Sequence, residues 1–321
     1  MGALSRRLSA SCAAAAVSIA TLAAQAPPPA STPVPDSPEI ERRLDDIRKV
    51  AGSDWAETFA FLCAANANKA NRPDDPALTP TRVFDNLAVV GRTGTAVWIV
   101  TTSTGLVLID SGYEDQLESV LLKGMTTLGL DPARVTHVIL AHGHADHVGG
   151  ARYFQQRGAH LVMGEADWSL APTLTRDLTM GDGQTLSVGD VTFTFVAIPG
   201  HTAGSLGVMF PVNDGPTIHR AALFGGSVLI PAFVSDEGLP QYARSVEHWA
   251  SVTRAMNVDV EIQNHPLYDG FAPKLARLQQ RRPGQPHPFV VGSASYQRFV
   301  DVMSGCAQVQ LARRAGASRK P

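Results

Sequence analysis

The residues of this chain that are best suited to bind a metal or take part in catalysis lie in one block, Leu140-Ala141-His142-Gly143-His144-Ala145-Asp146-His147-Val148-Gly149. Three imidazoles and one carboxylate fall within six positions. Neutral imidazole and carboxylate are ligands that suit zinc, and a catalytic zinc keeps one position open for water. His142 and His144 can face one centre from an extended turn, whereas Asp146 and His147 can face a second. The block therefore predicts a metal site rather than a histidine-rich surface loop.

Two further histidines follow apolar strands elsewhere in the chain. His201 lies in Pro199-Gly200-His201-Thr202-Ala203-Gly204, directly after a predicted strand over residues 191–198. His265 follows a predicted strand over residues 258–262 in the same way. Glycines around a histidine mark a tight turn that fixes the direction of the imidazole, and loops at strand ends are a usual place for a functional site. With the first block, the chain offers six candidate ligands, enough for two sites of three ligands each.

Asp110 ends the apolar run Leu106–Ile109. A carboxylate at the end of a buried strand is costly unless it is paired or hydrogen-bonded. We therefore expect Asp110 to orient the histidine block from behind the ligands; a turn-forming aspartate is the alternative. The remaining histidines have no ligand context and are expected to be structural or solvated: His137, His160, His219, His248 and His287.

The elements that must position these residues alternate between strands and helices. The hydrophobic periodicity predicts two short helices before residue 64, one with Ile40, Leu44 and Ile47 on a single face. Strands are predicted over 83–90, 96–101, 106–109, 135–140, 159–163, 191–198, 207–210, 221–224 and 258–262, and later helices over 114–128, from 149, over 241–256 and over 296–311. No internal repeat of 20–50 residues is present in the sequence.

The first 26 residues have the composition of a secretory signal. Arg6 and Arg7 precede the apolar stretch Cys12–Ala24, and Ala24-Gln25-Ala26 offers a cleavage site. We expect cleavage after Ala26 and a periplasmic or secreted protein; a retained anchor or a lipoprotein at Cys12 is the alternative. The predicted organisation is a signal peptide (1–26), a Pro-rich linker with a helical N-terminal extension (27–80) and a main domain (81–321).

Composition limits the partners of the chain. A hydrophobic content of 44% in 321 residues indicates a folded globular protein. The net charge of -2 and the absence of a basic stripe in the sequence argue against a positively charged surface that would attract nucleic acid. No later segment is apolar enough for a membrane span, so a small-molecule substrate is the expected partner, and the oligomeric state is left open. Export would leave Cys63 and Cys306, which form either a disulfide or two buried thiols.

The ligand pattern as a whole resembles the metallo-β-lactamase superfamily, over residues 80–321. The resemblance implies an α/β fold of the αββα type, in which two mixed β-sheets pack face to face with helices on their outer faces and metals at one edge. It also implies two zinc ions per chain, the first held by His142, His144 and His201 and the second by Asp146, His147 and His265.

Residues 223–228 (Leu-Phe-Gly-Gly-Ser-Val) bear on the subgroup. Many hydrolases of the superfamily, glyoxalase II among them, carry a metal-bridging aspartate at this place, whereas this chain has Ser227. A serine here resembles the subclass B3 β-lactamases, which implies that Ser227 contacts metal-bound water or substrate and that Asp146 orients the nucleophile. These two residues are the candidate catalytic residues. Leu229 departs from the pattern, because B3 enzymes commonly present a second hydroxyl there for the β-lactam carboxylate.

The resemblance implies an exported zinc-dependent hydrolase that opens the cyclic amide of β-lactam antibiotics by attack of a zinc-bound hydroxide, and so confers antibiotic resistance. One alternative is a related exported metallo-hydrolase that acts on a lactone, an ester or another amide. A non-catalytic zinc-binding protein is the other alternative, and the intact six-ligand set argues against it.

Overall fold

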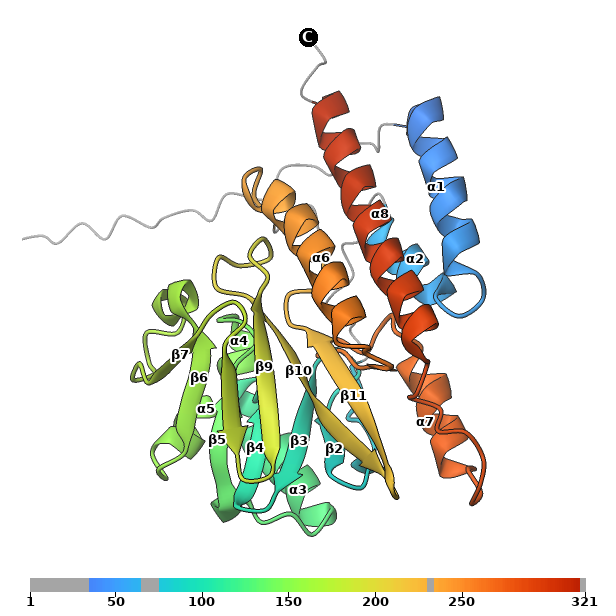
Figure 1. The fold of residues 1–321 in the computed structure, drawn as a ribbon. Coiled ribbons are helices and arrows are strands. Elements are labelled where there is room, and N and C mark those ends of the chain that lie inside the picture. The colour runs from blue at the N-terminus through green and yellow to red at the C-terminus, as the bar shows by residue number, and fades with distance from the viewer. Residues whose placement is uncertain (1–34, 65–74, 230–233, 318–321) are drawn as a thin grey trace, which may run out of the picture. The chain divides into compact units, whose positions relative to one another are not determined.

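A computed structural model describes residues 35–64, 75–229 and 234–317 (Figure 1). The expected signal peptide and most of the Pro-rich linker lie outside these residues, as does the chain from 230 to 233. The chain from Pro35 onward forms one folding unit. Within the described ranges, no helix combines the length and apolar character that a membrane span requires.

Seven strands in sequence order form the first sheet. Its first four strands are antiparallel neighbours, and the pairs from β4 to β7 are parallel. The strands are β1 (Thr81–Phe84), β2 (Leu87–Gly91), β3 (Ala96–Thr102), β4 (Gly105–Ile109), β5 (Val135–Ile139), β6 (His160–Gly164) and β7 (Leu178–Met180). The single strand predicted over 83–90 is wrong, because a turn at Asp85 and Asn86 divides it into β1 and β2.

The second sheet has five strands in the order β12-β11-β10-β9-β8. All its pairs are antiparallel except β11 with β12. The strands are β8 (Thr185–Val188), β9 (Val191–Ala197), β10 (Leu206–Asp214), β11 (Thr217–Phe224) and β12 (Val260–Glu261). Alternate residues of β10 face the first sheet and the outer helices, which is the pattern expected of a strand that is buried on both faces.

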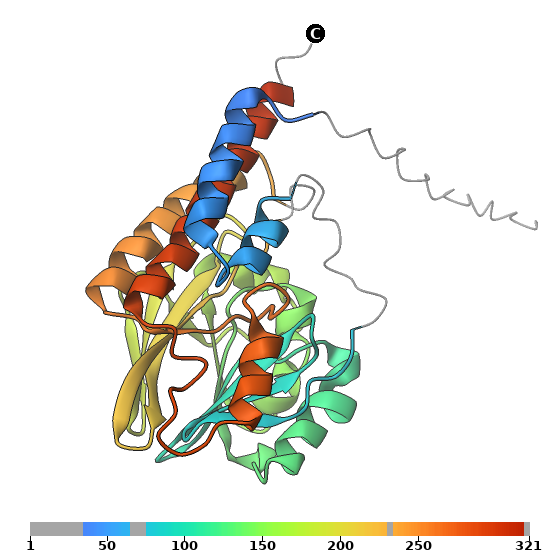
Figure 2. The same cartoon turned by 90° about the vertical axis from the view of Figure 1, so that its right-hand side faces the viewer.

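The two sheets pack face to face, with helices on both outer faces (Figures 1 and 2). Aromatic side chains fill the space between the sheets, among them Trp98, Phe193, Phe195 and Phe210. Helices α3 (Lys123–Thr127), α4 (Ala145–Val148) and α5 (Ala151–Gln155) lie on the side of the first sheet, whereas α6 (Gly238–Ala255) and α8 (Ser293–Ala317) cover the second. The predicted αββα sandwich is confirmed.

The N-terminal helices α1 (Pro38–Ala51) and α2 (Ala56–Leu62) complete the layer over the second sheet (Figure 2). Ser37 caps α1, and Ile40, Leu44 and Ile47 face the core as predicted. α1 runs antiparallel to α8, since Asp36 pairs with Arg313 at one end and Asp54 with Arg298 at the other.

A disulfide links Cys63, just after α2, to Cys306 in α8. Both cysteines are buried in the core that the N-terminal helices share with α6 and α8. The two alternatives for these cysteines are therefore resolved in favour of the disulfide. The link closes a loop with a sequence separation of 243 residues.

Candidate metal centre

The candidate ligands all follow the C-terminal ends of strands. The block at 142–147 comes after β5 and continues into α4, His201 comes after β9, and His265 comes after β12. His142 and His147 are buried, His201, His265 and Asp146 are half-buried, and His144 is exposed. The structure brings all six side chains together, and the exposed His144 marks the side that opens to solvent.

In the first triad, three imidazoles converge. His201 Nε2 lies 3.2 Å from His142 Nε2 and 3.1 Å from His144 Nδ1. On its other side, His201 Nδ1 lies 3.0 Å from the carbonyl oxygen of Val228. Because a carbonyl can only accept, Nδ1 donates this hydrogen bond, and Nε2 of the neutral ring presents a lone pair to the other two histidines.

The second triad has the same construction. His147 Nε2 lies 3.2 Å from Asp146 Oδ2 and 3.2 Å from His265 Nε2, and His265 Nε2 lies 3.8 Å from Asp146 Oδ2. His265 Nδ1 donates to the carbonyl of Gly94 at 2.6 Å, and His147 Nδ1 donates to Asp110 Oδ2 at 2.7 Å. Both Nε2 atoms are therefore turned toward the carboxylate of Asp146.

This donor set fits a divalent metal, typically zinc. Tetrahedral ligation with zinc–nitrogen distances of about 2.0–2.1 Å separates the ligand atoms by about 3.3 Å, and the closest contacts within the triads are 3.1–3.2 Å. In the first triad, the converging lone pairs repel one another unless a cation lies between them. Backbone and carboxylate acceptors fix the ring orientation of His147, His201 and His265.

Burial determines the protonation of most of the cluster. It lowers the pKa of His201 to about 3, with the neighbouring imidazoles acting in the same direction, and it lowers the pKa of His142 well below its ordinary value. Neutral imidazole is the ligand form. Burial also opposes a charge on His147, but the carboxylates of Asp146 and Asp110 outweigh it and raise the pKa of this ring to about 10. A metal in the second triad must therefore displace the proton of His147.

Asp110 lies behind the second triad, as its place in the sequence predicts. Its Oδ1 accepts from Ala141 N at 2.8 Å, and its Oδ2 accepts from His147 and from Asn264 Nδ2, the latter at 3.0 Å. The residue has φ of 63°, which L-residues rarely adopt, so the contacts hold a strained backbone. Asn264 also donates to the carbonyl of Gly225 at 3.0 Å. The role of Asn264 was not predicted from the sequence, although its place beside His265 was the available signal.

Ser227 is a buried residue of the segment that follows β11. Its side chain is fully buried, its hydroxyl has no hydrogen-bond partner among the described residues, and its carbonyl accepts from Tyr242. Leu229 is buried in the core with the outer helices. Direct contact between Ser227 and substrate has no support in this arrangement, because the side chain exposes no surface, and its substrate-binding role stays a prediction.

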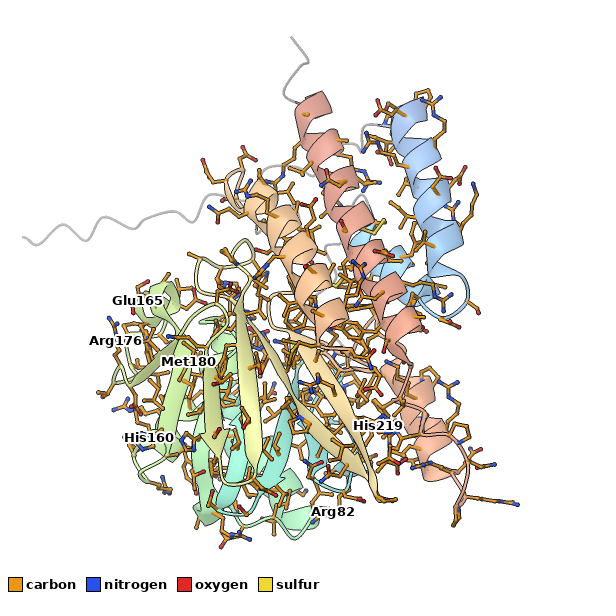
Figure 3. All side chains as sticks on the ribbon, viewed as in Figure 1. Arg82, His160, Glu165, Arg176, Met180 and His219 are labelled. Atoms are coloured by element: carbon orange, nitrogen blue, oxygen red, sulfur yellow. A yellow bond between two sulfur atoms is a disulfide. The ribbon has the colours of Figure 1, made fainter. Side chains whose placement is uncertain are left out.

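The histidines expected to be structural are all separate from the two triads. His160 on β6 and His219 on β11 lie on different sheets (Figure 3), where they contact Asp177 and Asp259, respectively. His287 donates to the carbonyl of Val83, His248 pairs with Asp182, and His137 contacts Thr136.

A cavity of 590 Å³ lies beside the turn that carries the first ligands. Gly143 and Ala145 form its wall on the side of the site, and Tyr113 and Leu170 line it further out. Leu170 is one of the few exposed large apolar side chains, with 49% of its surface accessible. Apolar and aromatic surface next to a polar centre is typical of a small-molecule site.

The family model of the metallo-beta-lactamase superfamily matches residues 90–214, which include the first block of ligands and His201. Over these residues the chain is similar to the metallo-β-lactamase superfamily.

Among solved structures, the chain is similar to BJP-1, a subclass B3 metallo-beta-lactamase of Bradyrhizobium japonicum. The two are 26% identical with a TM-score of 0.65, over 75% of this chain and 97% of that one. Native FEZ-1 metallo-beta-lactamase from Legionella gormanii, 21% identical with a TM-score of 0.66 over 78% and 100% of the two chains, shares the fold.

Curated relatives match over shorter stretches. A hydroxyacylglutathione hydrolase of Pseudomonas putida (strain GB-1) is 34% identical over 98 residues, which cover 30% of this chain and 35% of the relative. The metallo-beta-lactamase type 2 of Bacillus cereus is 28% identical over 177 residues, which cover 52% and 65% of the two chains. The chain thus matches about one third to two thirds of the length of these relatives.

Proposed function

We propose that this protein is an exported hydrolase that holds two zinc ions and opens the cyclic amide of β-lactams. The observation that carries the proposal is the pair of adjoining triads, one of three imidazoles and one of two imidazoles and a carboxylate. The likeness to BJP-1 over nearly all of that chain supports the β-lactam substrate class.

The residues divide the work between the two triads. His142, His144 and His201 would hold one ion, and Asp146, His147 and His265 the other. Bound metal of this kind supplies a water of lowered pKa and polarises a carbonyl oxygen.

Asp146 is suited to orient a water nucleophile. Its Oδ2 faces His147 and His265, so its second oxygen is available to accept a hydrogen bond. His147 and Thr95 help to hold the carboxylate, Thr95 Oγ1 at a distance of 3.5 Å from Oδ2. The pKa of Asp146 lies far below its ordinary value, because His147 outweighs the effect of burial. The group therefore stays ionised and can act as an acceptor throughout the neutral range.

A second candidate is a related hydrolase that acts on a thioester, a lactone or another ester. The hydroxyacylglutathione hydrolase relatives favour it, at 34% identity over part of the chain. The segment 225–229 contains no carboxylate, so this chain lacks a metal-bridging aspartate of the kind that many such hydrolases carry there. We therefore rank this function second.

The experiment is hydrolysis of a penicillin, a cephalosporin, a carbapenem, an acyl-glutathione thioester and a lactone by the purified mature protein. EDTA should abolish turnover, and added zinc should restore it. Preferred β-lactam turnover supports the first function. Preferred thioester or lactone turnover by a protein that binds two zinc ions refutes it in favour of the second, and a chain that binds no zinc refutes both.

Export is part of the proposal. The N-terminal sequence and the disulfide between Cys63 and Cys306 both suit an oxidising compartment. Fractionation of expressing bacteria, with N-terminal sequencing of the recovered protein, is the test. A mature chain that begins at Pro27 in the periplasm or medium is the expected result, and an uncleaved cytoplasmic chain contradicts it.

A further inference from the structure

A buried carboxylate outside both triads hydrogen-bonds to both loops that carry the first triad. Asp167 lies in the short 3-10 helix η4 (Glu165–Leu170), which follows β6, and it exposes none of its surface. Its Oδ2 accepts from Gly143 N at 2.8 Å and from Thr202 Oγ1 at 2.6 Å, and its Oδ1 accepts from Gly204 N at 2.7 Å.

The donors belong to the loops that carry the first triad. Gly143 lies between His142 and His144, and Thr202 follows His201. One carboxylate therefore fixes the distance between the two loops from which all three imidazoles project. The second triad has a different support, because Asp110 hydrogen-bonds directly to His147.

Close packing leaves the loops no alternative arrangement. A Cβ added to Gly143 would lie 2.9 Å from the carbonyl oxygen of Asp167, and a Cβ added to Gly204 would lie 2.7 Å from Asp167 Oδ1. The two backbones therefore approach Asp167 as only glycine allows, Gly143 at its main chain and Gly204 at its carboxylate.

An ionised carboxylate accepts at both oxygens, whereas an amide must point its N–H₂ group either at Gly204 N or at Gly143 N and Thr202 Oγ1. Replacing the carboxylate of Asp167 by an amide therefore leaves buried donors without an acceptor on one side.

We propose that Asp167 is a positioning residue that sets the metal affinity of the first triad and leaves the second triad independent. The inference rests on the metal sites of the proposed function but not on its substrate. Outer-shell partners of this kind change metal affinity by about 10- to 100-fold when they are replaced.

The test isolates each site. His265→Ala removes one ligand of the second triad, and His201→Ala removes one ligand of the first. Asp167→Asn is added to each background, and zinc affinity is measured by competition with a chromophoric chelator. We expect a loss of about 10- to 100-fold in the His265→Ala background and less than about twofold in the His201→Ala background.

Asp177→Asn is the matched control. Asp177 also accepts a backbone hydrogen bond, from Leu161 N at 3.0 Å, but contacts neither triad. It should leave zinc affinity unchanged in both backgrounds. If Asp167→Asn does not fold, as judged by circular dichroism, the pair Thr202→Val and Thr202→Ser replaces it, with affinity lost in the first and kept in the second.

Equal losses at both sites, or no loss at the first, overturn the inference. Failure of the proposed function is a separate result. In that case the unaltered chain binds no zinc. If the unaltered chain binds two zinc ions tightly and Asp167→Asn leaves the zinc affinity unchanged, only the role of Asp167 is contradicted.

Discussion

Removal of the disulfide between Cys63 and Cys306 should cost a large part of the stability of this fold. Chain entropy sets the magnitude, because the link closes a loop with a separation of 243 residues. For a loop of that length the loop-closure treatment gives about 5.5 kcal/mol near 25 °C, and native disulfides contribute about 2–5 kcal/mol when they are removed. We therefore expect the Cys63→Ala/Cys306→Ala variant to lose about 3–5 kcal/mol of its free energy of unfolding.

The assay is equilibrium unfolding in guanidinium chloride, followed by tryptophan fluorescence. The cross-linked denatured chain is more compact, so the slope of free energy against denaturant should increase when the link is removed. Reduced wild-type protein is the control for packing, because it keeps both sulfur atoms in the core but lacks the link. Its midpoint should lie close to that of the double variant.

Single variants give the sharpest refutation. Either Cys63→Ala or Cys306→Ala removes the whole cross-link, so each should cost nearly as much as the double variant. Single losses of about 1 kcal/mol that add up in the double variant would instead describe two independent buried thiols. Two free thiols in the oxidised native protein, measured with a thiol reagent, would also refute the reasoning.

Three further changes test the fold and the site. Asp36→Asn should lower the free energy of unfolding by about 1–2 kcal/mol near pH 7, with a smaller difference near pH 3. The hydrogen bonds from Arg313 hold the pKa of Asp36 below its ordinary value, and this stabilisation is lost as the pH falls through the lowered pKa. Chemical unfolding at both pH values measures the difference, and a pH-independent difference contradicts the prediction. Gly207→Ala should destabilise the fold by about 1–3 kcal/mol, since its Cβ would lie 2.3 Å from the Trp249 ring. Thermal unfolding measures this loss, and equal melting temperatures for variant and wild type would refute the close packing of Gly207 against Trp249. His201→Ala should keep one zinc per chain and lose most turnover, so two retained zinc ions in metal analysis would refute the first triad.

Much of the site could be predicted because its residues carry their own signal. Imidazoles at ligand spacing after apolar strands, and a carboxylate at the end of β4, are unusual wherever they occur. Asp167 carries no such signal, because its role depends on which loops meet in space, and the signal of Asn264 is limited to its place beside His265. Ser227 differs from these residues, since its position in the motif predicts contact with metal-bound water or substrate while its side chain is buried, and that role stays a prediction.

The layers of the fold were predictable for a similar reason. Strands β3 and β4 are apolar on both faces, which indicates the interior of a sandwich. Strands β7 and β8 were missed because they are short and only partly buried, and helix α7 (Phe271–Gln279) was missed because its core contacts are few. The helix predicted over 114–128 is present as the 3-10 helix η1 (Glu114–Gln116), the π-helix η2 (Leu117–Leu122) and α3.

The pairing of α1 with α8 has a consequence for the order in which the protein can fold. A ribosome releases residues 38–62 long before residues 293–317, yet Ile40 and Leu44 share one core cluster with Phe299 and Met303. Helices α1 and α2 therefore cannot complete their packing until α8 has been synthesised, and contacts of such large sequence separation form slowly. A nascent chain in which α8 has not yet been synthesised cannot complete this core cluster. Loss of the last helix by truncation would expose apolar surface and promote aggregation rather than yield a smaller enzyme.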